Sequence, residues 1–388
     1  MRKEMFNHEI TILRDTYRRL LRRNARVNLV KLTGKTHPAD LAEVFRHFSK
    51  EEQFEIFSLM KENEHAAEFL VELDDALVIE LLENESNDRI ASIIEKAPTN
   101  DQSGILNILE DEKAQSIIEL LNTEEQEEIA EIMGYPDDSA GTLMNTEVFT
   151  LHESITAGEA IQTLQDQEGA EMVFYLYITD DDDRLVGVIS LRALTTTPSS
   201  TKLKDIMIKN IHSIRPETDQ EDVARIVAQY NFLAVPVLDS DSKLLGIVTV
   251  DNVVDVIREE ATEDFLRMAG AGKDREILLK SSWENAKARL PWLFASWIGG
   301  IVAASIIGAF ENMLVNIVAL AAFIPVILGM GGNIATQSST IIVRGMATGR
   351  VNIGGEIKLI FKEIKVGLIL GSLYGILLGV FAKFTFTS

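Results

Sequence analysis

Apolar residues in the first third of the chain recur at helical spacing. Between residues 36 and 133 they fall three and four positions apart, as in Leu70, Leu73 and Leu77. This spacing predicts amphipathic helices. Short helices in series are typical of a superhelical bundle. We therefore expect an α-helical, superhelical N-terminal domain over residues 1–134.

Three pairs of residues have the spacing of a capping box. In this motif a Ser or Thr and a Glu or Gln three residues later satisfy each other's backbone N–H groups at a helix start. The pairs are Ser49 with Glu52, Thr99 with Gln102, and Thr123 with Gln126. We expect each pair to begin a helix, and a new helix to begin about every 20–25 residues in the later part of this region.

A basic segment precedes these helices. Residues 11–32 predict a single helix with six arginines: Arg14, Arg18, Arg19, Arg22, Arg23 and Arg26. Such a face can bind lipid or nucleic acid. A solvated face, or a contact with the acidic remainder of the chain, is the commoner arrangement, and we expect one of these two.

Residues 135–257 change to short strands and contain an internal repeat. GTLMNTEVFTLHESITAGEA, which begins at Gly141, aligns 63 residues later with KDIMIKNIHSIRPETDQEDV. RLVGVISLRAL, which begins at Arg184, aligns 59 residues later with KLLGIVTVDNV. Each half predicts a strand, a helix, two strands joined by a hairpin turn, and a helix, with DDDD at 180–183 and DSDS at 239–242 as the turns.

This repeat resembles a tandem pair of CBS domains, the α/β regulatory module of the cystathionine-β-synthase type, over residues 135–200 and 201–257. The resemblance implies an adenine-nucleotide site with an Asp three residues after a Thr or Ser in the last strand–helix turn. Here Asn252 follows Thr249, and Ala193 follows Ser190 in the first half. Because Asn can hydrogen-bond a ribose but supplies no charge, Thr249 and Asn252 form only a weak nucleotide site.

The last third of the chain contains long uncharged stretches. Residues 291–310 carry no charge over the roughly 20 residues that cross a bilayer, and further spans are predicted at about 314–343 and 364–384. Basic residues precede the first span and lie between the second and third. The positive-inside rule therefore places residues 1–290 in the cytosol. We expect an α-helical, multi-pass transmembrane domain over residues 281–388, embedded in the cell (inner) membrane.

The second predicted span is polar in its middle, where it reads GMGGNIATQSS. Such residues at membrane depth indicate either close helix packing or a path lined by water. Asn333 and Gln337 favour the second interpretation, because they lie one helical turn apart and offer amide oxygens to a hydrated cation. We take Gly331, Gly332, Asn333 and Gln337 as candidate pore-lining residues.

Charge separates the same regions. The net charge is −23, but residues 1–35 hold ten basic and three acidic residues, residues 36–280 hold 19 and 53, and residues 281–388 hold eight and four. So acidic a middle segment argues against nucleic acid as a partner. The chain has no Cys, its six His lack metal-ligand spacing, and neither a P-loop nor a GxSxG motif occurs, so we do not expect an enzyme.

The order of these regions resembles the MgtE family of magnesium channels. The most specific segments are YPDDSAGTLM at 135–144, EEATED at 259–264, and GGN, TQS and VRG across 331–345. The resemblance implies a homodimer with a pore at the subunit interface. It also implies a plug helix between the CBS pair and the first span, here over about 251–280, and magnesium as both the transported and the regulatory ion.

The resemblance also implies how the pore is gated. Magnesium bridges acidic surfaces of the cytosolic domains and the plug helix and holds the pore shut, as suits an ion that prefers oxygen ligands. The positions that match the family's ligands are Glu68, Asp101, Asp255, Glu260, Glu263 and the backbone of Gly141. The positions where the family has Asp and this chain does not are Asn100, Gly104, Asn231 and Asn252. Since Asn lacks the charge, we expect a sensor that closes only at higher magnesium.

The number of spans departs from the family as well. The family has five spans and an ion-selecting Asp on the fifth, whereas three spans without a carboxylate are predicted here, so we expect a shortened member. Two other functions stay open. One is a CBS-regulated transporter of another divalent cation, and the other is a non-conducting, magnesium-sensing subunit.

Overall fold

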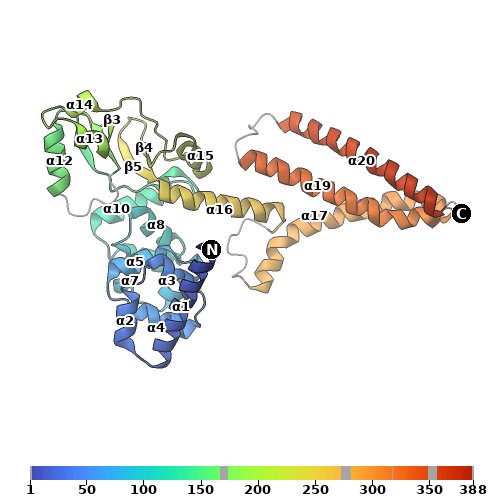
Figure 1. Ribbon diagram of the computed structural model, residues 1–388, viewed down its shortest axis with the longest axis horizontal. Coiled ribbons are helices and arrows are strands. Elements are labelled where there is room, and N and C mark those ends of the chain that lie inside the picture. The colour runs from blue at the N-terminus through green and yellow to red at the C-terminus, as the bar shows by residue number, and fades with distance from the viewer. Residues whose placement is uncertain (1, 167–173, 272–280, 317, 348–355, 387–388) are drawn as a thin grey trace. The chain divides into compact units, whose positions relative to one another are not determined.

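The expected multidomain architecture is confirmed: a helical N-terminal part, a pair of small α/β folds and three long apolar helices (Figure 1). The chain divides into two compact units, residues 1–256 and 257–388. Helix α16 (Val250–Met268) begins in the first unit and ends in the second. The computed structural model describes residues 2–166, 174–271, 281–316, 318–347 and 356–386.

The basic segment forms two helices, not the single helix that its sequence predicts. These are α1 (Arg2–Arg22) and α2 (Arg26–Thr33). The chain reverses between them at Asn24, whose φ of +50° lies in the left-handed region that Asn tolerates. Tyr17 of α1 is fully buried, and its hydroxyl hydrogen-bonds to those of Thr33 and Thr36. The apolar side of α1 is therefore part of the domain core.

The acidic helices follow at a regular interval. They are α3 (Pro38–Phe45), α4 (Lys50–Ser58), α5 (Asn63–Val71), α6 (Asp75–Glu83), α7 (Asn87–Ile94), α8 (Thr99–Asn107), α9 (Asp111–Ile118) and α10 (Thr123–Ile132). Because consecutive helices start 12 or 13 residues apart, the predicted interval of about 20–25 residues is wrong. Helices α5, α6 and α9 begin without a side-chain cap, so the capping pattern could not reveal them.

Of the three predicted capping boxes, only the one at Ser49 forms. Gln102 and Gln126 instead donate their side-chain amides to the carbonyls of Ala97 and Leu121, at 2.9 and 2.8 Å. Neither Thr of these two pairs is the cap residue of its helix. A Gln has an amide donor that a Glu lacks, so it can donate to a carbonyl in the turn that follows the preceding helix.

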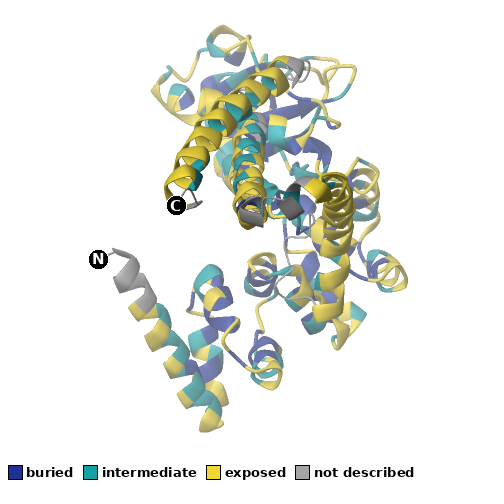
Figure 2. Ribbon diagram, turned by 90° about the vertical axis from the view of Figure 1, so that its right-hand side faces the viewer, coloured by how far each residue is buried: buried dark blue, intermediate teal, exposed yellow. Residues whose placement is uncertain are grey.

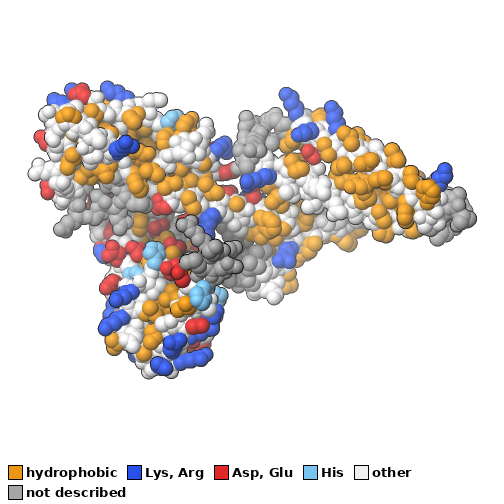
Figure 3. Space-filling model, viewed as in Figure 1, with side chains coloured by type: hydrophobic (Ala, Val, Ile, Leu, Met, Phe, Trp, Pro, Cys, Tyr) orange, Lys and Arg blue, Asp and Glu red, His pale blue; other side chains and the backbone are white. Residues whose placement is uncertain are grey.

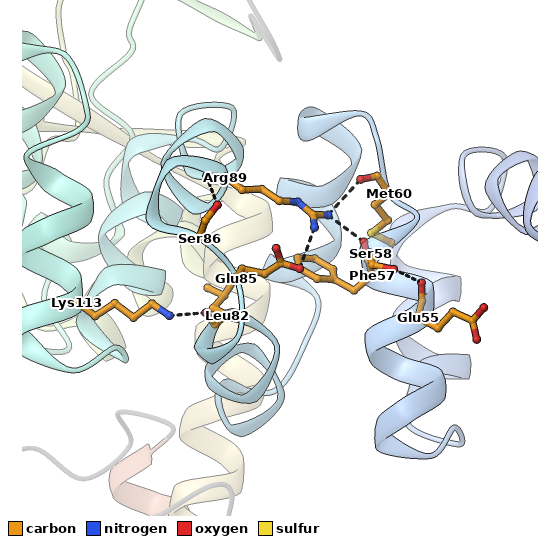
Figure 4. A network of polar contacts seen from close by, with 9 residues as sticks. All are labelled: Glu55, Phe57, Ser58, Met60, Leu82, Glu85, Ser86, Arg89 and Lys113. Atoms are coloured by element: carbon orange, nitrogen blue, oxygen red, sulfur yellow. Dashed lines mark hydrogen bonds and ion pairs between the residues drawn. The ribbon is translucent and has the colours of Figure 1, made fainter.

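A second set of contacts repeats every 24 residues. His65, Arg89 and Lys113 each occupy the third position of their helices, α5, α7 and α9. Each reaches backbone carbonyls at or near the C-terminal end of the helix three places earlier, which are those of Thr33, of Phe57 and Met60, and of Leu82 and Glu83. Figure 4 shows the contacts of Arg89 and the bond from Lys113 to Leu82. A side-chain N–H group satisfies these carbonyls, and the positive charges of Arg89 and Lys113 also interact favourably with the negative end of the helix dipole. These hydrogen bonds connect helices that are three places apart in the superhelix.

Replacing Arg89 with Ala should lower the free energy of unfolding by about 2–3 kcal/mol. Besides its two carbonyl bonds, the guanidinium pairs with Glu85 at 2.8 Å and lies over the Phe57 ring at 5.2 Å, so the change leaves several polar groups unpartnered. Thermal unfolding of the purified chain measures the effect. Lys61→Ala, at an exposed position, is the matched control, and equal melting temperatures for the two variants would contradict the prediction.

The repeated segment forms the second part of the first unit. Its elements are α11 (Ala140–Leu143), β1 (Thr150–His152), α12 (Ala157–Asp166), β2 (Tyr175–Thr179), β3 (Leu185–Ser190), α13 (Leu191–Thr196), α14 (Leu203–Ile206), α15 (Gln220–Tyr230), β4 (Ala234–Leu238) and β5 (Leu244–Thr249). Strand β2 pairs in parallel with β1 and antiparallel with β3, and β4 pairs antiparallel with β5. The predicted hairpin turns form, with Asp183 and Ser242 at positive φ. The opening strand of the second half is reduced to a bridge between Ile214 and Val237.

The two halves of the repeat pack reciprocally. Met207 of the second half lies against Gly187 of the first, and Met144 of the first lies against Gly246 of the second. A Cβ atom at Gly187 would overlap with the Met207 side chain, and one at Gly246 would overlap with the Asn145 carbonyl and lie in tight contact with Met144. Since each half contributes to the core of the other, the pair folds as one body.

The second unit contains the apolar helices α17 (Ser282–Ala309), α19 (Ile324–Ala347) and α20 (Glu356–Phe386), with α18 (Glu311–Asn316) and a 3₁₀ turn (Val318–Phe323) between the first two. By length and composition, Ser282–Ala309, Ala321–Gly345 and Lys358–Thr385 can cross a membrane. Their most apolar windows are entirely unburied (Figure 2). The second span is shorter than predicted because its first residues form α18 and the 3₁₀ turn. The first is longer, because a capping box at Ser281 starts the helix before Pro291.

Candidate functional site

Three carboxylates from two elements come together in the first unit. Asp101 lies in the first turn of α8, while Asp251 and Asp255 lie one turn apart at the start of α16. Burial, and after it the charges of Asp251 and Asp255, raise the pKa of Asp101 to about 6. Ionising all three groups together therefore costs free energy.

Asn100 fixes the Asp101 carboxylate. Asn100 is buried, and its side-chain amide donates to Asp101 Oδ1 at 2.9 Å. Beside it, the hydroxyl of Thr146 hydrogen-bonds to the hydroxyl of Thr99 and to Glu128 Oε2, each at 3.0 Å. Because Thr146 belongs to the CBS-like pair and the others to the helical part, these bonds hold the two parts together next to the acidic group.

The acidic group does not enclose an ion. Within the residues that the structure describes, no three His, Asp or Glu side chains lie close enough to hold one metal ion. Magnesium, however, usually keeps several of its waters and binds proteins through one or two carboxylates. Oxygen-only donors that repel one another and remain partly open to water fit a hydrated magnesium ion better than a fully dehydrated one.

The structure brings together only part of the predicted ligand set. Asp101 and Asp255 lie in one group, which also includes Asp251, a residue that the sequence prediction missed. Its signal was the four-residue spacing of Asp251 and Asp255 on one helix. Glu68 is exposed on α5. Glu260 and Glu263 lie in the second unit, where the buried Glu263 pairs with Arg267.

Gly141 has a packing role that its sequence did not reveal. Its N–H donates to the Pro216 carbonyl at 2.8 Å, and a Cβ atom there would overlap with the Tyr135 ring. The close approach of the ring requires glycine at this position. Gly104, one of the departures from the family pattern, is exposed on α8 with open space around it.

Two of the Asn residues that replace family acids also have local roles. Asn231 ends α15 in the left-handed conformation, with φ +55°, which Asn adopts more readily than most residues. Asn252 accepts a hydrogen bond from the Thr249 hydroxyl through its Oδ1 atom. Thr249 and Asn252, the weak nucleotide site of the sequence prediction, are thus bonded to each other.

A cavity of about 190 Å³ is lined in part by Ala234, which is the strand partner of Thr249. Its wall is formed by Tyr175, Tyr177, Val188, Ile208, Asn210, Ile211, His212, Phe232, Ala234 and Pro236. The His212 ring lies 4.3 Å from that of Tyr230, which stacks on Phe232 at 5.4 Å. Flat aromatic rings of this kind suit a planar base.

The predicted pore residues lie along α19. Gly331, Gly332, Asn333 and Gln337 are all exposed there. The next residue, Ser338, donates to Glu363 Oε2 of α20 at 2.6 Å. Glu363 lies near the start of the segment Lys358–Thr385, which is long and apolar enough to cross a membrane, and directly before the span predicted at 364–384. The sequence placed it just outside the third span because lysines flank it.

Comparison with known proteins yields matches to each region. Residues 36–138 match the MgtE intracellular N domain, residues 140–198 and 203–259 match CBS domains, and residues 324–388 match a family described as divalent cation transporter. A magnesium transporter MgtE of Bacillus subtilis (strain 168) is 30% identical over 344 residues, which cover 88% of this chain and 76% of that protein.

Two further relatives are more similar over a shorter stretch. The magnesium transporters MgtE of Thermus thermophilus and Enterococcus faecalis are each 39% identical, over 240 and 249 residues. These stretches cover 61% and 64% of this chain, and 53% and 54% of the relatives. The chain therefore spans little more than half the length of these two proteins.

Two crystal structures resemble about two thirds of this chain. The soluble part of a magnesium transporter matches with a TM-score of 0.59 at 29% identity, covering 65% of this chain and 99% of that one. The cytosolic domain of the Mg²⁺ channel MgtE in complex with ATP matches with a TM-score of 0.60 at 31% identity, covering 63% and 99%.

Proposed function

This chain belongs to the MgtE family of magnesium transporters, and we propose that it conducts magnesium across the cell membrane and is closed by magnesium bound to its cytosolic acids. The observation that carries the gating part is the meeting of Asp101 with Asp251 and Asp255. These residues come from the helical part and from the first turns of α16, so an ion that bridges them holds two elements together.

Repulsion among the three carboxylates, and its removal by magnesium, shifts the equilibrium between an open and a compact state. Without a divalent ion the three carboxylates repel, and the state in which they are apart is favoured. A magnesium ion between them reverses this preference, because it binds the compact state better than the open one. Helix α16 is continuous to Met268. A movement of α16 at Asp255 therefore also moves its C-terminal turns, which precede the membrane segment in the chain.

We further propose that the sensor is weakened. Asn100 and Asn252 flank Asp101 and Asp251 and contribute no negative charge. Each amide is also engaged by a neighbour, Asn100 by Asp101 and Asn252 by Thr249. Fewer charges around the ion mean weaker binding, so closure requires a higher magnesium concentration.

A homodimer with α19 at its pore is the proposed conducting state. The exposed glycines Gly331 and Gly332 allow a second copy to approach closely, and Asn333 and Gln337 on the same helix offer amide oxygens to a hydrated ion. The ATP complex of the similar cytosolic domain supports an adenine-nucleotide site in the aromatic cavity of this chain. The site is weak here because Asn252 carries no charge.

Transport in vesicles tests the proposal. The full chain, reconstituted around a magnesium-sensitive dye, is expected to admit magnesium, and magnesium on the cytosolic side is expected to stop the flux. Asn333→Ala with Gln337→Ala should reduce the flux at least tenfold, as expected when about 1.4 kcal/mol or more of ion coordination is lost. Ser305→Ala, on a span without a polar stretch, is the control.

The broader description of the matched membrane family favours one second candidate, a transporter of another divalent cation. Cobalt and calcium in the same assay distinguish the two functions. Flux of either ion equal to that of magnesium would support the second candidate. A chain that admits none of the three ions would contradict both and favour a non-conducting, magnesium-sensing subunit.

A further inference from the structure

The basic N-terminal segment takes no part in the acidic site, and most of its charge is unneutralised. Arg19, Arg22, Arg23 and Arg26 are exposed, and within the described residues none of them forms an ion pair with a carboxylate. Arg14, in contrast, pairs with Asp15 at 3.1 Å. We call the four exposed arginines the basic face.

The basic face borders a hollow. A concavity of about 360 Å³ is lined by Asp15, Arg18, Arg19, Arg22 and Arg23. The guanidinium group presents a planar fork of donors that matches phosphate oxygens, so several of them around one hollow suit a phosphate-bearing ligand. In Figure 3, Lys and Arg side chains gather at the lower end of the helical part, where Figure 1 places α1 and α2.

Binding here has to be electrostatic. The apolar side of α1 is already used, because Leu13, Tyr17, Leu20 and Leu21 belong to or pack against the core of the helical part. A membrane-inserting amphipathic helix needs that side for the acyl chains. What α1 and α2 offer to a partner is therefore mainly charge, and attraction of this kind is screened by salt.

We propose that the basic face docks on the anionic phospholipid headgroups of the membrane that the C-terminal helices can cross. Three such helices belong to the same chain, so contact of the basic face with that bilayer is an intramolecular event, and docking is favoured by effective concentration. Basic clusters near a membrane are attracted to the anionic lipids of the cytoplasmic leaflet. The inference rests on the membrane anchor and its orientation and not on magnesium transport.

Two other partners are disfavoured. The acidic helices of the same unit are already packed in place, and their carboxylates do not reach the basic face. Nucleic acid would have to approach a chain whose next 245 residues carry 53 acids and 19 bases. A lipid surface avoids that repulsion best, since it is planar and is touched by one end of the domain.

A single fluorescent label can test the docking, because the natural chain has no Cys. The full chain with Asn28→Cys, at the exposed start of α2, carries the donor, and the vesicle headgroups carry the acceptor. Fluorescence resonance energy transfer from this donor to the headgroup acceptor is expected to be high in vesicles that contain phosphatidylglycerol and low in vesicles of pure phosphatidylcholine. High salt should reduce the transfer. In R19Q/R22Q/R23Q/R26Q the docking equilibrium constant should fall up to roughly a thousandfold.

The matched control removes equal charge elsewhere. K61Q/K96Q/K204Q/K209Q changes four exposed lysines outside the basic face and should keep the transfer seen in the natural sequence. R22Q/R23Q, a milder variant, should give an intermediate loss and guards against misfolding of the fourfold variant. Equal transfer in both lipid mixtures, or an equal loss in the control, would overturn the proposal.

The other partners would leave their own signatures. Transfer that depends on the four arginines but not on lipid charge would indicate an acidic protein surface. Dependence on the arginines that disappears after nuclease treatment would indicate nucleic acid. Either result overturns docking on lipid, and neither depends on whether the chain conducts magnesium.

Discussion

Asp101→Asn is expected to stabilise the metal-free chain at pH 8 by up to about 3 kcal/mol. Asp101 is partly buried beside Asp251 and Asp255, and its pKa rises from an ordinary 3.8 to about 6. Each pKa unit between the folded and unfolded states is worth about 1.4 kcal/mol. An Asn has nearly the same shape, keeps a hydrogen-bonding oxygen and removes the unfavourable charge.

The gain should depend on pH with a definite sign. Because the folded state holds the Asp101 proton more tightly than the unfolded state, the natural chain has its full stability from this group below about pH 4. It loses that stability as the pH rises through about 6. The difference between Asp101→Asn and the natural sequence should therefore be small at pH 4 and largest at pH 8.

Thermal unfolding in a chelating buffer, at both pH values, measures the difference. Asp137→Asn, at an exposed position of the same unit, is the control and should change little. Saturating magnesium should shrink or reverse the advantage of Asp101→Asn, since the ion favours a carboxylate over an amide. A gain that is the same with and without magnesium would separate Asp101 from the sensor.

Asn100→Asp should make the sensor bind magnesium about tenfold more tightly, the equivalent of about 1.4 kcal/mol. The new carboxylate would stand in a buried position next to Asp101 and would add negative charge to the group. For the same reason the metal-free chain should lose about 2 kcal/mol of stability, because like charges are brought together out of water. Weaker metal-free folding and tighter magnesium binding are expected together.

Protection from limited proteolysis, followed as magnesium is titrated, reports the midpoint of compaction. The matched control is Asn84→Asp, which adds the same charge at the exposed C-terminal end of α6, outside the acidic group and the predicted ligand set. Its midpoint should stay near that of the natural sequence. Equal shifts for the two variants would mean that overall charge, and not the group around Asp101, sets the magnesium response.

Much of the fold could be predicted from the sequence, because strands, turns and membrane helices leave patterns among neighbouring residues. The repeat predicted the order of strands and helices in the CBS-like pair except for the opening strand of the second half, which is only a bridge, and the hairpin turns at 180–183 and 239–242 form. Uncharged stretches predicted three membrane helices. The helix interval failed, because helices that begin without a side-chain cap leave no pattern to count.

The group around Asp101 was only partly open to prediction. Resemblance to a family pointed to Asp101 and Asp255, but Asp251 required the knowledge that α8 meets the start of α16. Glu363 was discounted because lysines flank it, and its bond to Ser338 joins residues 25 positions apart. Contacts of this range depend on how helices pack, which spacing along one helix does not encode.

Composition and periodicity by themselves determined that this chain has three helices able to cross a membrane, an acidic middle segment, a basic N-terminal segment and a duplicated α/β module. Those properties are sums or repeats over neighbouring residues. Tertiary structure alone decided which acids lie close enough to raise the pKa of Asp101 and which Asn ends α15 in the left-handed conformation. It also decided which arginines have no carboxylate partner among the described residues. The physical reason is that electrostatic energy depends on distance and burial, and both are set only when distant elements pack together.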